Sequence, residues 1–142
     1  MVLNPERAAA VVVESEIDGL LLSQEAGDLV TCVSMGTATA KPDRITHEIL
    51  TAAAVILVSL DTDEAGAKAA WSFWPETYGT KEKRWPCIGG KDPSDARLGG
   101  LDLRFWVIIK IFGTEERFER FCIQTIDGGL SDEEAIAERG RC

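Results

Sequence analysis

Three continuous apolar runs alternate with segments of helical spacing, and this alternation constrains the fold of the chain more than any other feature. The runs cover residues 9–13, 29–33 and 53–60. Such runs are typical of strands that are buried on both faces. Because parallel strands cannot be joined by tight turns, three strand–helix repeats predict an α/β fold, with right-handed crossovers and helices on both faces of a parallel sheet.

The second half of the chain predicts a sheet edge and a helical tail. Residues 85–88 could form a fourth strand, which Pro86 would confine to the edge of the sheet. The apolar stretch 101–112 predicts a packed helix that stops at Gly113. Capping residues predict two further helices in the tail. The expected architecture is therefore a sheet of about four strands flanked by helices, with a helical C-terminal tail.

Charge and cysteine content exclude several classes of function. The 142 residues include 15 basic and 24 acidic side chains, a net charge of -9, so a broad basic surface for nucleic acid is disfavoured and any such contact must be local or metal-mediated. The four cysteines form no CxxC pair, which argues against structural zinc. The apolar runs are too short to cross a bilayer, and no signal peptide is recognisable at the start. We therefore expect a cytoplasmic protein without a membrane contact.

Acidic side chains follow the predicted strands. Glu14 follows the first strand, Asp61 and Asp63 follow the third, and Asp92 and Asp95 follow the probable fourth. Ligands of open parallel sheets bind outside the carboxyl ends of the strands. Asp61 and Asp63, two residues apart, would point to the same side of an extended backbone and could share one cation. Carboxylates without histidine or cysteine favour Mg²⁺ or Mn²⁺, whose remaining ligands are often phosphate oxygens.

Each acidic residue taken alone has a simpler structural interpretation. Asp63 could cap a helix beginning near residue 64, Glu14 could be a solvated residue at a strand end, and 91–95 could be a proline-fixed turn. His47 is expected to be exposed and not a catalytic base. The joint placement of carboxylates at three strand ends is what favours a metal site.

Four segments resemble the motifs of the Toprim family, the fold shared by primases and topoisomerases. Residues 12–18 resemble the first Toprim motif, with Ser15 in place of the usual glycine. Residues 34–39 resemble the SLGT-like loop of bacterial-type primases, 58–66 their DxDxAG segment, and 91–95 their KDPN-like motif. The resemblance covers roughly residues 10–107 and is closest to the primases of bacteria, phages and plasmids.

The resemblance implies a Toprim-type, Rossmann-like domain over residues 1–112. Residues 113–142 match no Toprim motif, and we expect them to form a helical extension that is packed on the domain or flexible. It implies catalytic roles for Glu14, Asp61 and Asp63, and metal positions at these three residues, Asp18 and Asp92. The implied activity is Mg-dependent nucleotidyl transfer, with RNA primer synthesis in DNA replication, by one part of a larger protein. Nucleotides and nucleic acid would be partners, reached through other primase subdomains or a replicative helicase.

The same sequence features are compatible with two other functions. A Toprim nuclease would use the same carboxylates to hydrolyse phosphodiesters. A non-catalytic module for assembling nucleic-acid-processing proteins would need the fold alone. Type IA topoisomerases carry a glutamate directly after the glycine of the second motif, whereas Ala67 follows Gly66 here. A topoisomerase would also need a nucleophilic tyrosine on another domain.

Overall fold

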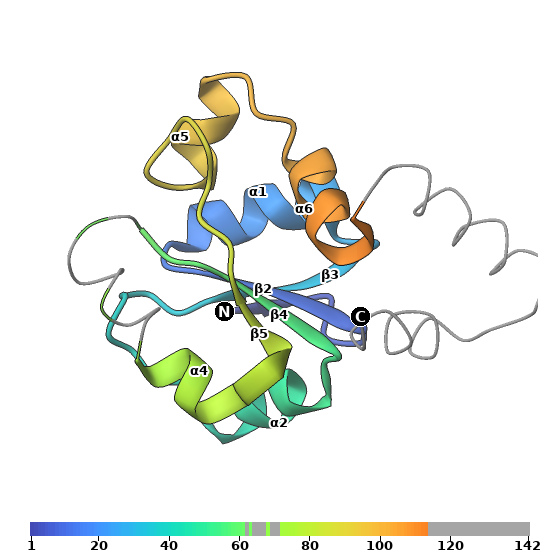
Figure 1. The fold of residues 1–142 in the computed structure, drawn as a ribbon, viewed down its shortest axis with the longest axis vertical. Coiled ribbons are helices and arrows are strands. Elements are labelled where there is room, and N and C mark those ends of the chain that lie inside the picture. The colour runs from blue at the N-terminus through green and yellow to red at the C-terminus, as the bar shows by residue number, and fades with distance from the viewer. Residues whose placement is uncertain (62, 64–67, 69–71, 114–142) are drawn as a thin grey trace, which may run out of the picture.

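A computed structural model describes residues 1–61, 63, 68 and 72–113, as five strands packed between helices (Figure 1). The strands are β1 (Val2–Leu3), β2 (Ala9–Val13), β3 (Val30–Ser34), β4 (Val55–Ser59) and β5 (Glu82–Arg84). The helices are α1 (Glu16–Ala26), α2 (Arg44–Ala52), α4 (Phe73–Tyr78), α5 (Pro93–Leu98) and α6 (Leu103–Phe112), and a 3₁₀ turn, η1 (Gly79–Lys81), precedes β5. Within these described residues, no helix has the length and apolar character that a membrane span requires.

The sheet has the order β1-β3-β2-β4-β5. The strands β3, β2, β4 and β5 run parallel, which confirms the predicted α/β class and parallel sheet. The fifth strand, β1, was not predicted: it pairs antiparallel with β3 and places Val2 opposite Val33. A strand of two residues carries no periodic pattern, so the sequence gives no signal for it.

The central strand β2 separates two apolar layers, because all five of its residues are fully buried and their side chains alternate between the faces of the sheet. Val11 and Val13 face the layer that includes Leu22 of α1 and Leu103 of α6. Ala10 and Val12 face the opposite layer, and the residues that α2 and α4 bury there are Leu50, Trp74 and Tyr78. Figure 1 shows α1, α5 and α6 on one side of the sheet and α2 and α4 on the other. Helices on both faces were predicted, and this is confirmed.

The edge strand lies three residues earlier than predicted. We expected a strand at 85–88, whereas β5 ends at Arg84. The backbone N–H of Trp85 still donates to the carbonyl of Val58, at 2.9 Å. Pro86 has no N–H with which to continue this ladder, which accounts for the end of the pairing.

Helix α2 begins after Asp43, whose carboxylate accepts a hydrogen bond from the Thr46 backbone N–H at 2.8 Å, so Pro42 precedes the helix. Its buried residues are Thr46 and Leu50, while Ile45 is 62% exposed. The predicted helices beyond Gly113 lie outside the described residues.

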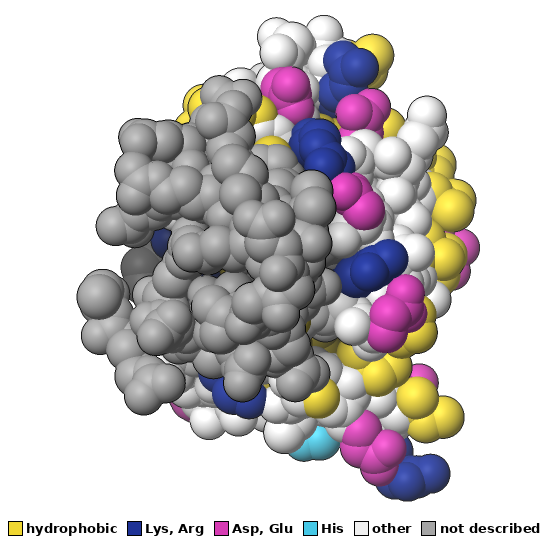
Figure 2. Space-filling model, turned by 90° about the vertical axis from the view of Figure 1, so that its right-hand side faces the viewer, with side chains coloured by type: hydrophobic (Ala, Val, Ile, Leu, Met, Phe, Trp, Pro, Cys, Tyr) yellow, Lys and Arg dark blue, Asp and Glu magenta, His cyan; other side chains and the backbone are white. Residues whose placement is uncertain are grey.

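An ion pair connects α6 to the segment that follows α1. Arg104 of α6 donates from Nη1 and Nη2 to the two carboxylate oxygens of Asp28, at 2.6 and 2.8 Å, and this hydrogen bonding lowers the pKa of Asp28. Figure 2, which looks at the right-hand side of Figure 1, shows acidic and basic side chains beside one another on that face. Exposed pairs of this kind contribute about 1 kcal/mol or less to stability.

Candidate metal centre

The parallel register of β2 and β4 determines which acidic residues come together. Val13 lies opposite Ser59, so both strands end at the same level of the sheet. Glu14 directly follows β2, and Asp61 follows β4 after one intervening residue. Neighbouring strands are roughly 5 Å apart, which brings these two carboxylates to one place at the carboxyl edge. The register therefore places Glu14 and Asp61 at the same carboxyl edge of the sheet, where the sequence predicts that acidic strand ends converge.

Two further carboxylates reach the same edge from helix starts. Asp18 lies in the first turn of α1, and Asp92 is the N-cap of α5. One carboxylate oxygen each from Asp18, Asp61 and Asp92 lies within 4.8 Å of the other two. Three elements far apart in the sequence thus place their oxygens around one point, and we call these three residues with Glu14 the acidic centre.

Asp18 is the most buried and the most strongly bonded member of the acidic centre. Its side chain is 2% exposed. Oδ1 accepts from the backbone N–H and the hydroxyl of Ser94, at 2.9 and 2.6 Å, and Oδ2 accepts from the hydroxyl of Ser15 at 2.5 Å. Asp18 therefore ties α5 to the start of α1, and little of its acceptor capacity is left for a cation.

Asp92 combines a helix-capping hydrogen bond with an ion pair. Its Oδ1 accepts from the backbone N–H of Asp95 at 2.8 Å, as a helix cap does, and its Oδ2 lies 3.6 Å from Nζ of Lys91. The segment 91–95 is thus a helix start, where the simpler interpretation of the sequence had a turn. Capping uses one oxygen, and the other accepts no hydrogen bond from the described residues but lies near Lys91.

Glu14 supplies the observation that points to a cation. Its Oε2 atom is buried and has no hydrogen-bond donor within the described part of the chain. A buried carboxylate oxygen without a partner is costly, and a positive ion would offset that cost. The pKa of Asp61 is raised, first by burial and then by the charges of Glu14, Asp92 and Asp18. An oxygen-only set of carboxylates that repel one another fits a hard divalent cation such as Mg²⁺ or Mn²⁺.

The comparisons with known proteins give one informative similarity. No family model matches the sequence, and no curated protein matches it significantly. The crystal structure of the primase fragment of the bacteriophage T7 primase-helicase protein, which contains a Toprim domain, is similar with a TM-score of 0.53 and 27% sequence identity. The similarity covers 65% of this chain and 39% of the T7 chain.

The chain has a primase-like Toprim fold. All four members of the acidic centre belong to segments that resemble Toprim motifs. Glu14 and Asp18 belong to the first motif, Asp61 to the DxDxAG segment, and Asp92 to the KDPN-like motif. The departure of Ser15 from the Toprim glycine now has a physical reason. Ser15 is the N-cap of α1, and its hydroxyl both accepts from the Asp18 backbone N–H and donates to the Asp18 carboxylate.

Asp63 has a different position from the other predicted ligands. It is exposed, and it does not belong to the group of Asp18, Asp61 and Asp92, whose carboxylate oxygens lie close together. The helix that Asp63 was alternatively expected to cap lies outside the described residues. Cation binding shared by Asp61 and Asp63 therefore stays a prediction.

Cys87 lies beside the acidic centre, and no sequence motif predicted this position. Its Sγ atom lies 3.7 Å from the hydroxyl of Ser59, at the end of β4. Burial raises the pKa of the thiol to about 11, the Ser59 hydrogen bond opposes this shift, and Asp18 and Asp92 add to it. The thiol is therefore neutral at physiological pH and packs beside the carboxylates without adding charge.

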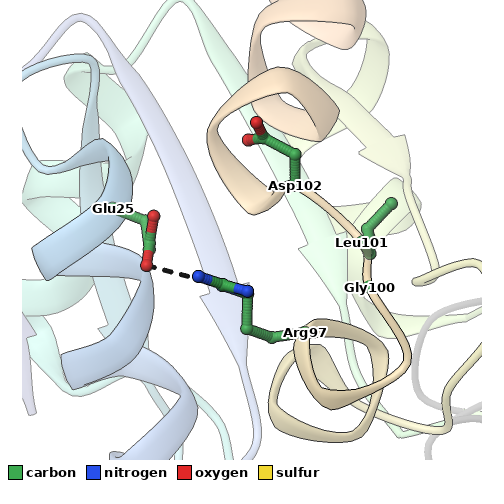
Figure 3. A pocket seen from close by; sticks show the side chains of 5 residues that line it. All are labelled: Glu25, Arg97, Gly100, Leu101 and Asp102. Carbon is green, nitrogen blue, oxygen red and sulfur yellow. Dashed lines mark ion pairs between the residues drawn. The ribbon is translucent and has the colours of Figure 1, made fainter.

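A separate small pocket lies between α1 and the connection from α5 to α6 (Figure 3). It has a volume of about 140 Å³ and is lined by Glu25, Arg97, Gly100, Leu101 and Asp102. Nε of Arg97 lies 3.5 Å from Oε1 of Glu25, and this pair bridges the two walls. No member of the acidic centre lines the pocket.

The raised pKa of Asp61 predicts how the metal-free protein responds to pH. A carboxyl whose pKa is raised by folding stabilises the fold below its ordinary pKa, and that stabilisation is lost as the pH rises through the raised value. We expect the melting temperature of the protein in a chelator to fall, relative to that of Asp61→Asn, as the pH rises from about 4 to about 7. Thermal unfolding at a series of pH values measures this difference. An unchanged difference would show that the charges of the acidic centre do not interact.

Proposed function

We propose that this chain is the Mg-dependent Toprim catalytic domain of a DNA primase-like protein, which joins ribonucleotides into RNA primers during DNA replication. The observation that carries the proposal is that carboxylate oxygens of Asp18, Asp61 and Asp92 lie close together in a primase-like Toprim fold. At the same edge of the sheet, the buried Oε2 of Glu14 accepts no hydrogen bond from the described residues. Asp18 and Asp92 also accept structural hydrogen bonds, but four carboxylates at one edge of the sheet repel one another, and a bound cation would offset that repulsion.

The residues best suited to hold the metal are Glu14, Asp61 and Asp92, because each keeps a carboxylate oxygen that accepts no hydrogen bond from the described residues. Asp63, exposed and two residues from Asp61, remains a proposed ligand and catalytic residue. When bound, Mg²⁺ or Mn²⁺ would supply positive charge to the transferred phosphate and to the leaving group.

The side chains themselves suggest a division of roles. Oε2 of Glu14 is buried and accepts no hydrogen bond from the described residues, so it is suited to take a proton from an attacking 3′ hydroxyl. Asp18 acts as a positioning residue, because its bonds to Ser94 set the start of α5 and with it the place of Asp92. Exposed Lys91, beside Asp92, is available to a substrate phosphate.

The extent of the domain and its partners form part of the same proposal. Residues 1–112 would be the Toprim domain and 113–142 a helical extension. Since the similarity covers only 39% of the T7 chain, priming would require further primase subdomains or a partner such as a replicative helicase. The substrates would be nucleotides and a nucleic-acid template in the cytoplasm.

Ribonucleotide incorporation on a single-stranded DNA template tests this function. We expect template-dependent RNA products with Mg²⁺ or Mn²⁺, and a loss of about 100-fold or more in Glu14→Gln, which keeps the shape of the side chain but cannot accept a proton as a carboxylate does. Asp95→Asn, at an exposed position on α5, serves as the matched control. Shortened template without RNA products would favour the Toprim nuclease instead. If neither RNA nor shortened template forms, even after the primase subdomains of a related phage enzyme are added, the result would favour the non-catalytic assembly module.

A further inference from the structure

Lys91 places a positive charge beside the acidic centre. Its Nζ atom lies 3.6 Å from Oδ2 of Asp92. The pKa of Asp61 is raised by burial and by the neighbouring carboxylates, and the charge of Lys91 opposes this rise. One ammonium group therefore acts on two of the three residues best suited to hold the metal.

The ammonium group faces the carboxylate oxygen of Asp92 that helix capping does not use. Oδ1 accepts from the backbone N–H of Asp95 at 2.8 Å, whereas Oδ2 accepts no hydrogen bond from the described residues. Oδ2 is therefore the oxygen of Asp92 with the greater capacity for a cation. A divalent ion and Lys91 would use the same atom.

The geometry of this ion pair allows Lys91 to leave. The distance of 3.6 Å exceeds the roughly 2.7–2.9 Å of a hydrogen bond between charged groups. The Lys91 side chain is 64% exposed, and a lysine ammonium on its flexible stem is strongly hydrated. Asp92 is only 13% exposed and is fixed as the N-cap of α5. The lysine can thus move into water while the carboxylate stays in place.

A structural role in α5 does not account for a positive charge at residue 91. The start of a helix carries a partial positive charge, which acidic side chains stabilise and basic ones do not. Asp92 and Asp95 suit the start of α5 in this respect, whereas Lys91 does not. What the lysine does offset is the repulsion among the carboxylates of the acidic centre.

We propose that Lys91 is an internal counter-ion of the metal-free protein, which releases Asp92 when a divalent cation binds the acidic centre. Because the two cations compete for one carboxylate, Lys91 stabilises the metal-free fold and weakens metal binding. This inference rests on the proposed function, since it concerns the regulation of the metal site of that function.

The test is a calorimetric titration of Mn²⁺ into the full-length protein and four variants. The variants are Lys91→Gln, Asp92→Asn, the double variant Lys91→Gln/Asp92→Asn and, as the control, Lys83→Gln, which removes an exposed lysine of β5. Glutamine removes the charge of lysine, and asparagine can still cap α5.

We expect Lys91→Gln to bind Mn²⁺ about 5-fold (about 1 kcal/mol) more tightly than the unchanged protein, which is the upper range for an exposed ion pair. Lys83→Gln should bind as the unchanged protein does. Asp92→Asn should bind at least about 10-fold more weakly. The double variant should bind as Asp92→Asn does, because Lys91 has lost the carboxylate for which it competes.

Two results of this titration would overturn the proposal. If Lys91→Gln tightened binding by the same factor with Asp92 and with Asn at residue 92, the lysine would only repel the ion from a distance. If Lys91→Gln left the affinity unchanged, the lysine would not oppose metal binding at all.

Thermal unfolding gives a second readout, which a merely structural role would not move. Lys91→Gln should melt below the unchanged protein in EDTA, because the repulsion among the carboxylates then lacks its counter-ion. In saturating Mn²⁺ this difference should disappear, since tighter metal binding offsets it. An equal decrease in both conditions would overturn the exchange.

The outcomes separate this inference from the proposed function. Mn²⁺ binding by the unchanged protein that Lys91→Gln does not alter would contradict the exchange and leave the metal site standing. Mn²⁺ binding by Lys91→Gln alone would support both, because the lysine would then exclude the ion. No Mn²⁺ binding by either protein would contradict the metal site and the exchange together.

Discussion

Asp18→Ala is expected to lower the free energy of unfolding by about 2–4 kcal/mol, a large effect for one polar residue. The carboxylate is 2% exposed and accepts three hydrogen bonds, one from Ser15 and two from Ser94. Its removal would leave the partly buried Ser94 donors without this acceptor and would remove the hydrogen bonds between α5 and the start of α1. Relief of repulsion from Asp61 and Asp92 would offset part of this loss. Urea unfolding measures the change.

Two other variants show whether the hydrogen bonds are the cause. Asp18→Asn keeps one oxygen acceptor for Ser94, so its loss of stability should lie between those of the unchanged protein and Asp18→Ala. Asp95→Ala, at an exposed position of the same helix start, should change stability by about 0.5 kcal/mol or less. If Asp18→Ala were as stable as the unchanged protein, repulsion within the acidic centre would outweigh the bonds that Asp18 accepts.

The sheet could be predicted because its pattern is local. The run Ala9–Val13 is buried at every residue, and it is the central strand, as a continuous apolar run implies. The edges could not be predicted in the same way. β1 has two residues, and β5 consists of Glu82, Lys83 and Arg84, whose polar side chains suit an edge but resemble a loop.

The acidic centre could be predicted in part. The rule that ligands bind at the carboxyl ends of strands identified Glu14, Asp61 and Asp92. The sequence analysis assigned Asp63 a catalytic role and Asp18 only a metal position, whereas the structure places an oxygen of Asp18 near those of Asp61 and Asp92 and leaves Asp63 exposed. Asp18 is brought to the centre by the first turn of α1 folding back over the sheet edge, and its partner Ser94 is 76 residues away in the sequence. Contacts over that separation leave no periodic signal.

Asp61→Asn should weaken divalent cation binding by at least about 10-fold. Loss of a residue that only hydrogen-bonds a metal ligand already lowers metal affinity by about this factor, and loss of a ligand itself should cost at least as much. Asp61 accepts no hydrogen bond within the described residues, so its oxygens are free for a cation. Asp18→Asn should weaken binding less, since protein donors already occupy both oxygens of Asp18. Asparagine has nearly the shape of aspartate, so the comparison isolates the charge.

Calorimetric titration of Mn²⁺ into the unchanged protein, Asp61→Asn and the control Asp95→Asn tests the central claim most directly. The acidic centre predicts saturable binding by the unchanged protein and by Asp95→Asn, with a clear loss in Asp61→Asn. Equal binding by all three proteins, or no binding by any of them, would contradict a metal site at Glu14, Asp61 and Asp92.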